Sequence, residues 1–133
     1  MKIGELAERA AVSTKTIRYY ESIGLLPEPT RLASGYRDYD DGADERLRFI
    51  RDAQASGLSL AEIQSVLELK DTGQNSCAHT RSLLDRHLAD LDTQIARLVE
   101  ARRELSELSG RAGGLDPTGC TDPNRCQVIS ADA

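Results

Sequence analysis

The chain has 133 residues, of which 39% are hydrophobic and only 4% aromatic, so it can build a small helical core and favours oligomerisation. It has no run of 18 apolar residues and no apolar core segment near its charged N-terminus, which argues against a membrane-spanning helix and a signal peptide. We therefore expect a cytoplasmic protein with no membrane partner, whose three cysteines are thiols, metal ligands or redox groups rather than structural disulfides.

The net charge of −5 is unevenly distributed along the chain. Residues 1–37 carry a charge of +2, and the remaining residues carry −7. A basic head on an acidic body suits a protein that presents one end to an anion, although a solvated helical surface would show the same contrast.

Helical patterns dominate the first part of the chain. Apolar spacing predicts a helix within residues 2–10, and Ser13 is a suitable N-cap for a second helix over residues 14–22. Gly24 is well placed to end that helix. Two short helices joined by a tight turn at residues 11–12 form a helix-turn-helix pattern.

A short hairpin and two further helices are expected next. The Ser34-Gly35 pair predicts a tight turn and hence a hairpin, or wing. A third helix is expected over about residues 41–56. Ser59 and Glu62 form a capping box, which predicts a fourth helix that runs to about residue 69.

A linker then leads into one long helical pattern from Cys77 to about Leu108. Its apolar residues recur at alternating steps of four and three, which is a heptad seam interrupted only at Arg102. The seam consists of Leu84, Leu88, Leu91, Ile95, Leu98 and Leu105. The pattern predicts a coiled coil but does not say whether the helices pair in parallel or antiparallel. The Gly- and Pro-rich tail after residue 109 is expected to lack regular structure until a partner orders it.

The basic head has the pattern of a DNA reader. A helix that enters the major groove presents side chains from its N-terminal half to bases and phosphates, and a wing can hold the adjacent backbone. The candidate residues are Lys15, Arg18, Tyr19 and Tyr20 on the second helix and Arg31, Tyr36 and Arg37 on the wing. We expect Ile17 and one of the two helix tyrosines to belong to the core. The alternative interpretation is that these are ordinary surface cations and half-buried tyrosines.

The segment TIRYYESIGLL, followed by GYRDY and GLSLAEI, resembles the DNA-binding domain of the MerR family of transcription regulators. The resemblance implies a mainly α fold with a winged helix-turn-helix domain (residues 1–70), a linker and long antiparallel coiled-coil dimerisation helix (71–111), and a metal-binding loop and tail (112–133). It also implies a homodimer on a promoter palindrome, which distorts the double-stranded DNA so that RNA polymerase can engage both promoter elements. Ala11 stands where the family usually has Gly, and we expect a slight backbone adjustment there.

Three cysteines, Cys77, Cys120 and Cys126, are the candidate metal ligands. A helix from Cys77 to residue 109 would be about 50 Å long, and the extended return to Cys120 reaches about 40 Å at most. The two ends therefore do not easily meet within one chain. In an antiparallel dimer, which the family resemblance implies, the tail of one subunit would meet Cys77 of the other.

Three thiolates suit a soft metal ion. The family resemblance favours a divalent ion, and we expect Hg, Zn, Cd or Pb. Family members that sense divalent ions resemble this chain in having cysteine at the head of the long helix, whereas the Cu(I) sensors usually have serine there. His79 is the nearest candidate for a fourth ligand, or else a partly exposed polar residue, and His87 is expected to be a solvated surface residue.

Other functions stay open. A Cu(I) sensor would use only Cys120 and Cys126, and a redox sensor would join them in a disulfide. An iron–sulfur sensor of the family would need two more cysteines, where this chain has Leu115 and Thr118. Outside the regulators, the chain would be a cytosolic metal-buffering or thiol-redox protein. No catalytic constellation is visible, so an enzyme is not expected.

Overall fold

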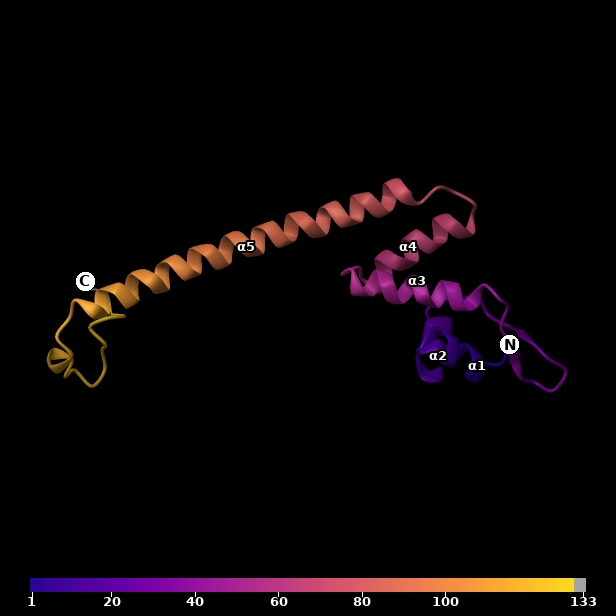
Figure 1. Ribbon diagram of the computed structural model, residues 1–133, viewed down its shortest axis with the longest axis horizontal. Coiled ribbons are helices and arrows are strands. Elements are labelled where there is room, and N and C mark those ends of the chain that lie inside the picture. Colours follow the sequence, from indigo (N-terminus) through magenta and orange to yellow (C-terminus); the bar gives the residue numbers. More distant parts are fainter. Residues whose placement is uncertain (131–133) are drawn as a thin grey trace. The chain divides into compact units, whose positions relative to one another are not determined.

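The computed structural model describes residues 1–130, and within them the chain is mainly helical (Figure 1). In chain order the elements are α1 (Ile3–Ala10), α2 (Thr14–Ser22), β1 (Thr30–Arg31), β2 (Arg37–Asp38), α3 (Ala43–Ala55), α4 (Leu60–Asp71), α5 (Cys77–Gly113) and the 3₁₀ turn η1 (Pro117–Gly119). The chain divides into two units, Met1–His87 and the part that begins at Leu88. No helix within residues 1–130 has both the length and the apolar content needed to cross a bilayer.

The helix-turn-helix is formed by α1 and α2, and its ends follow the predicted signals. The Ser13 hydroxyl accepts a hydrogen bond from the backbone N–H of Thr16, so it caps α2 as expected. Gly24 follows α2 with φ of +82°, a left-handed conformation that a side chain would disfavour. The turn between the helices is made by Ala11, whose φ of 55° and ψ of 42° are also left-handed.

A two-stranded antiparallel wing joins α2 to α3. Thr30 pairs with Asp38, and Arg31 pairs with Arg37. The predicted turn is present, because the N–H of Gly35 donates to the carbonyl of Leu32 over 2.9 Å. The hairpin predicted around residues 34–35 is therefore confirmed.

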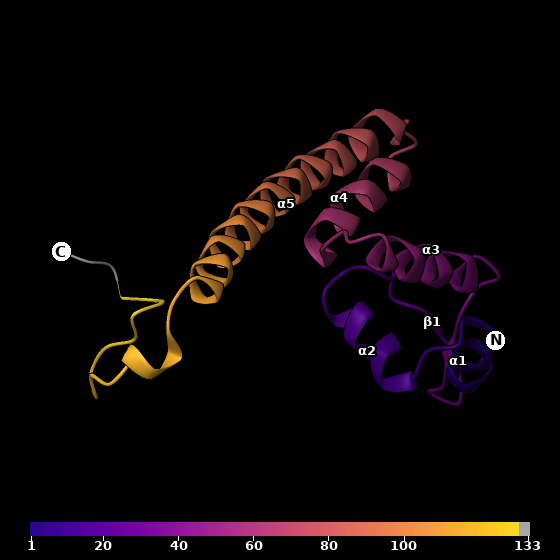
Figure 2. The same cartoon turned by 60° about the vertical axis from the view of Figure 1, so that its left-hand side comes forward.

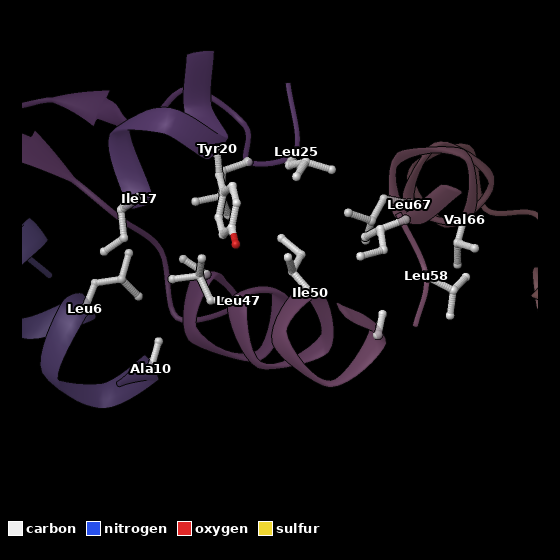
Figure 3. Close-up of a cluster of buried hydrophobic side chains, with 14 of the residues drawn as sticks. Leu6, Ala10, Ile17, Tyr20, Leu25, Leu47, Ile50, Leu58, Val66 and Leu67 are labelled. Atoms are coloured by element: carbon white, nitrogen blue, oxygen red, sulfur yellow. The ribbon is translucent and has the colours of Figure 1, made fainter. Parts of the chain in front are cut away.

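Helices α1 and α2 lie together on one side of α3 in both orientations (Figures 1 and 2). Their apolar faces meet in one core, where side chains from α1, α2 and α3 point toward one another (Figure 3). The largest fully buried side chains are Leu6, Ile17, Leu25, Leu47, Ile50, Ile63 and Val66. This core holds the exposed faces of α2 and the wing in fixed positions relative to each other.

Helix α4 begins with the predicted capping box. The Ser59 hydroxyl accepts from the N–H of Glu62 over 3.2 Å, and the Glu62 carboxylate accepts from the N–H of Ser59 over 2.9 Å. These two bonds satisfy backbone donors that the first turn of a helix otherwise leaves unpaired.

Helix α5 spans 37 residues and runs further than the sequence suggested. It continues through Gly110 to Gly113, where we expected the unstructured tail to have begun. Glycine costs only about 1 kcal/mol in a helix interior, and no proline lies between Pro29 and Pro117. The tail is also more ordered than expected, because the side-chain amide of Gln127 donates to the carbonyl of Asp116 over 2.9 Å and closes a loop.

Candidate functional site

The exposed face of α2 carries three of the predicted DNA-binding residues. Lys15, Arg18 and Tyr19 are exposed, and the Tyr19 ring is 52% accessible. Ile17 on the opposite face is fully buried. The 3.6-residue period of the helix thus separates a cationic outer face from the apolar core face.

Tyr20 lies in the core instead of on that face. Its side chain is only 8% exposed, and its hydroxyl donates to Oε1 of Gln54 over 3.0 Å. Burial raises the pKa of its phenol, so the ring stays neutral. Tyr20 is therefore the helix tyrosine that belongs to the core, and we remove it from the predicted set of DNA-contacting side chains.

The wing residues Arg31, Tyr36 and Arg37 occupy different environments. Tyr36 is 62% exposed, and Arg31 is exposed while its guanidinium donates to the carbonyl of Gly35 over 3.1 Å. Arg37 is half-buried and forms an ion pair with Glu21 of α2, with 3.4 Å between Nε and Oε2. This ion pair ties the second wing strand to α2.

Glu21 has a second partner from the wing side. The hydroxyl of buried Tyr39 donates to its carboxylate. The pKa of Tyr39 is raised well above that of a free phenol, mainly because the side chain is buried and secondly because of this hydrogen bond. The Arg37–Glu21–Tyr39 group therefore fixes the angle between α2 and the wing.

The structure brings the arginines of α2 and the wing together. Arg18, Arg31 and Arg37 all line two neighbouring surface depressions. One of these depressions is also lined by Lys2, a residue that the sequence analysis did not single out. Its ammonium lies 5.2 Å from the centre of the Tyr36 ring, within the range of a cation–π contact. A lysine immediately before the first helix was the only signal in the sequence that could have identified it.

The two tail cysteines also lie together. Cys120 and Cys126 are both exposed. The backbone N–H groups of Ile129 and Val128 lower the pKa of the Cys126 thiol, and a hydrogen bond from the Cys120 thiol adds to this. Such donors stabilise a thiolate, the form in which cysteine binds metal.

Cys77 stands at the other end of α5, at the first residue of the helix. It is exposed, and its backbone N–H donates to Oδ1 of Asn75 over 2.9 Å. Within residues 1–130 of a single chain, no three His, Cys, Asp or Glu side chains converge on a common point.

Both histidines face α4. Nε2 of His79 lies 2.8 Å from the hydroxyl of Ser65, so His79 is a partly exposed polar residue with a partner on α4. Nε2 of His87 lies 2.8 Å from Oε1 of Glu62, and the His87 side chain is 34% exposed. The expectation that His87 is a freely solvated surface residue is therefore wrong. Sequence periodicity placed it outside the heptad seam but did not reveal that α4 covers that side of α5.

Comparison with known proteins identifies the family to which the chain belongs. Residues 1–70 match the family described as "MerR HTH family regulatory protein", and residues 45–108 match "MerR, DNA binding". The chain is 37% identical over 120 residues to heavy metal-dependent transcription regulator 2 of Rhizobium meliloti, which covers 90% of this chain and 82% of that protein.

Two solved structures extend the likeness to the fold. A transcription regulator from Ralstonia metallidurans in complex with lead(II) is 36% identical, has a TM-score of 0.73, and covers 97% of this chain and 96% of its own. A MerR family regulator that lacks the sensor domain, bound to promoter DNA, is 26% identical with a TM-score of 0.57, and covers 85% of this chain and 83% of its own. The cationic α2 face, the wing and the matches over more than half of the chain lead to one conclusion: the chain belongs to the MerR family of helix-turn-helix transcription regulators.

Proposed function

We propose that this protein is a cytoplasmic, metal-responsive transcription regulator that binds promoter DNA as a homodimer and activates transcription by distorting that DNA. The observation that carries the proposal is the convergence of Arg18, Arg31 and Arg37 from α2 and the wing on shared surface depressions, in a chain whose relatives include a heavy metal-dependent regulator. The role we propose is regulatory, and we assign no catalytic activity to the chain.

Helix α2 enters the major groove in this proposal. An α-helix fits that groove, and Arg side chains there form paired hydrogen bonds to guanine or to phosphate. Lys15, Arg18 and Tyr19 are the α2 residues that reach the DNA, because they share the exposed face of the helix. On the wing, Arg31, Tyr36 and Arg37 contact the backbone, and Lys2 extends the same cationic surface.

The dimer forms through the heptad seam of α5. All six apolar seam residues are between 38% and 70% exposed in the single chain, and a stripe of that length is rarely left in water. We place the two helices antiparallel, as the family resemblance implies.

The inducer is a soft divalent ion, Hg, Zn, Cd or Pb, bound by Cys77 of one subunit and by Cys120 and Cys126 of the partner subunit. The 37 residues of α5 rise about 55 Å, whereas the seven residues from 114 to 120 reach about 25 Å at most, so chain length prevents the tail from returning to its own Cys77. The donor set fits such an ion, since all three thiols are exposed and the pKa of Cys126 is lowered. When bound, the metal joins thiolates from the two subunits.

Binding of the metal then favours one state of the dimer, and the DNA-binding domains follow. Bending and untwisting a promoter costs a few kcal/mol, which a difference in DNA affinity between the two dimer states can supply. RNA polymerase can then engage the promoter, because the distorted DNA presents both promoter elements in register.

A Cu(I) sensor is the second candidate, and one observation favours it. Cys120 and Cys126 are already brought together within one chain, without Cys77. Two thiolates are sufficient for a soft monovalent ion.

The deciding experiment is a chelator-competed titration of the reduced protein with Zn(II), Cd(II), Pb(II), Hg(II) and Cu(I), followed by thiolate-to-metal charge-transfer absorption. We expect tight binding of a divalent ion that Cys77→Ser weakens. Preference for Cu(I) that is indifferent to Cys77→Ser would support the second candidate.

The DNA-binding role is tested separately with Arg18→Ala. We expect loss of sequence-specific operator binding with unchanged metal affinity. Unchanged operator binding would contradict the placement of α2 in the groove.

A further inference from the structure

Helix α5 has a second contact face, distinct from the heptad seam. His79, Leu83 and His87 recur at steps of four residues, so they form one stripe along the first three turns. Leu83 is only 4% exposed and joins the core formed by α1 to α4, which we call the DNA-binding unit. The seam residue Leu88, in contrast, is 56% exposed. The stripe therefore fastens the start of α5 to α4 and leaves the seam open.

The two histidines contact α4 on either side of Leu83. The hydroxyl of Ser65 donates to the carbonyl of Glu62 over 2.5 Å, so its oxygen is free to accept from Nε2 of His79 over 2.8 Å. Nε2 of His87 lies 2.8 Å from Oε1 and 3.1 Å from Oε2 of Glu62. Because an ionised carboxylate only accepts hydrogen bonds, Nε2 of His87 carries the proton and donates.

Glu62 connects this contact to the start of α4. The carboxylate that accepts from His87 also accepts from the backbone N–H of Ser59, the N-cap of the helix. One side chain thus caps α4 and holds α5 at the same time. Displacing His87 along the axis of α5 by much less than one helical turn breaks a bond of this length.

We propose that the Glu62–His87 contact is the positioning link through which a movement of α5 is transmitted to the DNA-binding unit. His87 touches neither the DNA-binding residues nor the three cysteines named above, so it acts through Glu62 and α4. The His79–Ser65 hydrogen bond and buried Leu83 keep α4 and α5 in register when the Glu62–His87 hydrogen bond is strained or broken. The inference rests on the proposed function, because it assigns the route between the metal site and the DNA.

The test compares His87→Ala, which removes the donor, with His87→Gln, whose side-chain amide offers an N–H near the position of Nε2. Arg86→Ala at the neighbouring exposed position is the matched control. An operator selected from random duplexes carries 2-aminopurine at its centre, and its fluorescence is read with and without Pb(II). Charge-transfer titration gives Pb(II) affinity, and anisotropy gives operator affinity.

We expect His87→Ala to reduce the Pb(II)-dependent fluorescence change by about fivefold or more, with Pb(II) affinity and metal-free operator affinity retained. His87→Gln and Arg86→Ala should behave like the wild type. A merely structural role for His87 would instead lower operator affinity in both states. A full Pb(II) response in His87→Ala would overturn the proposal.

Amide hydrogen exchange of the metal-free protein provides a readout that does not depend on the inducer. His87→Ala should accelerate exchange over residues 77–87 at least about tenfold while leaving α2 and α3 unchanged, and His87→Gln should not. If none of Hg(II), Zn(II), Cd(II) and Pb(II) changes the DNA signal of the wild type, the proposed function fails. The exchange data then still decide whether the contact holds α5, since unchanged exchange in His87→Ala would refute the link on its own.

Discussion

At the scale of single residues, Ala11 carries the clearest backbone strain. Among residues 1–130 it is the only non-glycine residue with positive φ, and it is exposed. The turn between α1 and α2 is kept because the N–H of Val12 still donates to the carbonyl of Ala7 over 3.1 Å. The left-handed conformation costs an alanine about 1 kcal/mol. The turn therefore has the geometry that glycine would favour, and Ala11 is strained in it.

Ala11→Gly should therefore stabilise the protein by up to about 1 kcal/mol, partly offset by the greater freedom of glycine in the unfolded chain. Urea unfolding measures the difference. Ala61→Gly, at an exposed position in the first turn of α4, is the matched control and should destabilise by about 0.5–1 kcal/mol. A loss of stability in Ala11→Gly would refute the strain.

Glu62 makes stability depend on acidity. Its pKa is lowered from 4.5 to about 2, first by the hydrogen bond from the backbone of Ser59 and then by that from His87. A carboxylate with a lowered pKa stabilises the folded state above pH 4.5, and this contribution is lost as the pH falls from 4.5 to about 2.

Glu62→Gln keeps the capping geometry but removes the charge. We expect the difference in unfolding free energy between wild type and Glu62→Gln to be largest above pH 4.5 and to shrink toward pH 2. Urea unfolding across this window measures it, with Glu68→Gln, an exposed carboxylate further along α4, as the control for loss of one charge. A pH-independent difference would show that the Glu62 charge contributes nothing.

At the scale of elements, α5 separates two tasks onto two faces. Its seam residues are exposed, and Leu98 is 70% accessible. Its His79–Leu83–His87 stripe contacts α4. The heptad period fits pairing with another helix, whereas the stripe with steps of four serves contacts within the chain.

Leu98→Asp should weaken the dimer by about 3 kcal/mol or more, roughly a hundredfold in dissociation constant, because it buries an unpaired charge at the seam. The helical fold of residues 1–70 should persist, since Leu98 is not part of that core. Sedimentation equilibrium measures the dimer. Thr93→Asp, on the side of α5 opposite the seam, is the control, and equal weakening by both variants would place the interface elsewhere.

At the scale of the whole molecule, the proposed metal site is divided between chains. Cys77 begins α5, and Cys120 and Cys126 follow its end. Neither Cys77→Ser nor the double variant Cys120→Ser/Cys126→Ser can form a three-thiolate site as a homodimer.

Mixing these two variants should restore one site per heterodimer. In that heterodimer, the intact Cys77 of one subunit meets the intact tail of the other, so the mixture regains the wild-type affinity and the three-thiolate charge-transfer absorption, which neither variant shows alone. Pb(II) titration before and after subunit exchange measures this gain. Its absence, with exchange verified by mass spectrometry, would mean that the site is not shared between subunits.

The helices and turns could be predicted from the sequence because their determinants are local. The Ser13 N-cap, the Gly24 helix end, the turn at Gly35 and the Ser59–Glu62 capping box are all present as expected. Each depends on residues within a few positions of one another, where backbone geometry dictates the outcome. The end of α5 was misplaced because two glycines lower helix stability without terminating the helix.

The candidate sites were predictable only as residue types. Position and charge singled out Lys15, Arg18 and the wing arginines as candidates, but which of two adjacent tyrosines faces the core depended on where Gln54 of α3 lies. The sequence did not reveal that Lys2 belongs to the cationic surface, because this depends on the wing, which places the Tyr36 ring beneath its ammonium.

By itself, the sequence determined the helix boundaries to within a few residues, the heptad seam and the positions of the thiols and cationic side chains. The tertiary structure decided which of these groups meet: Arg37 with Glu21, and His87 with Glu62. The physical reason is that caps, turns and periodicity arise from interactions a few residues apart. Contacts between residues distant in sequence depend on how the helices pack against one another.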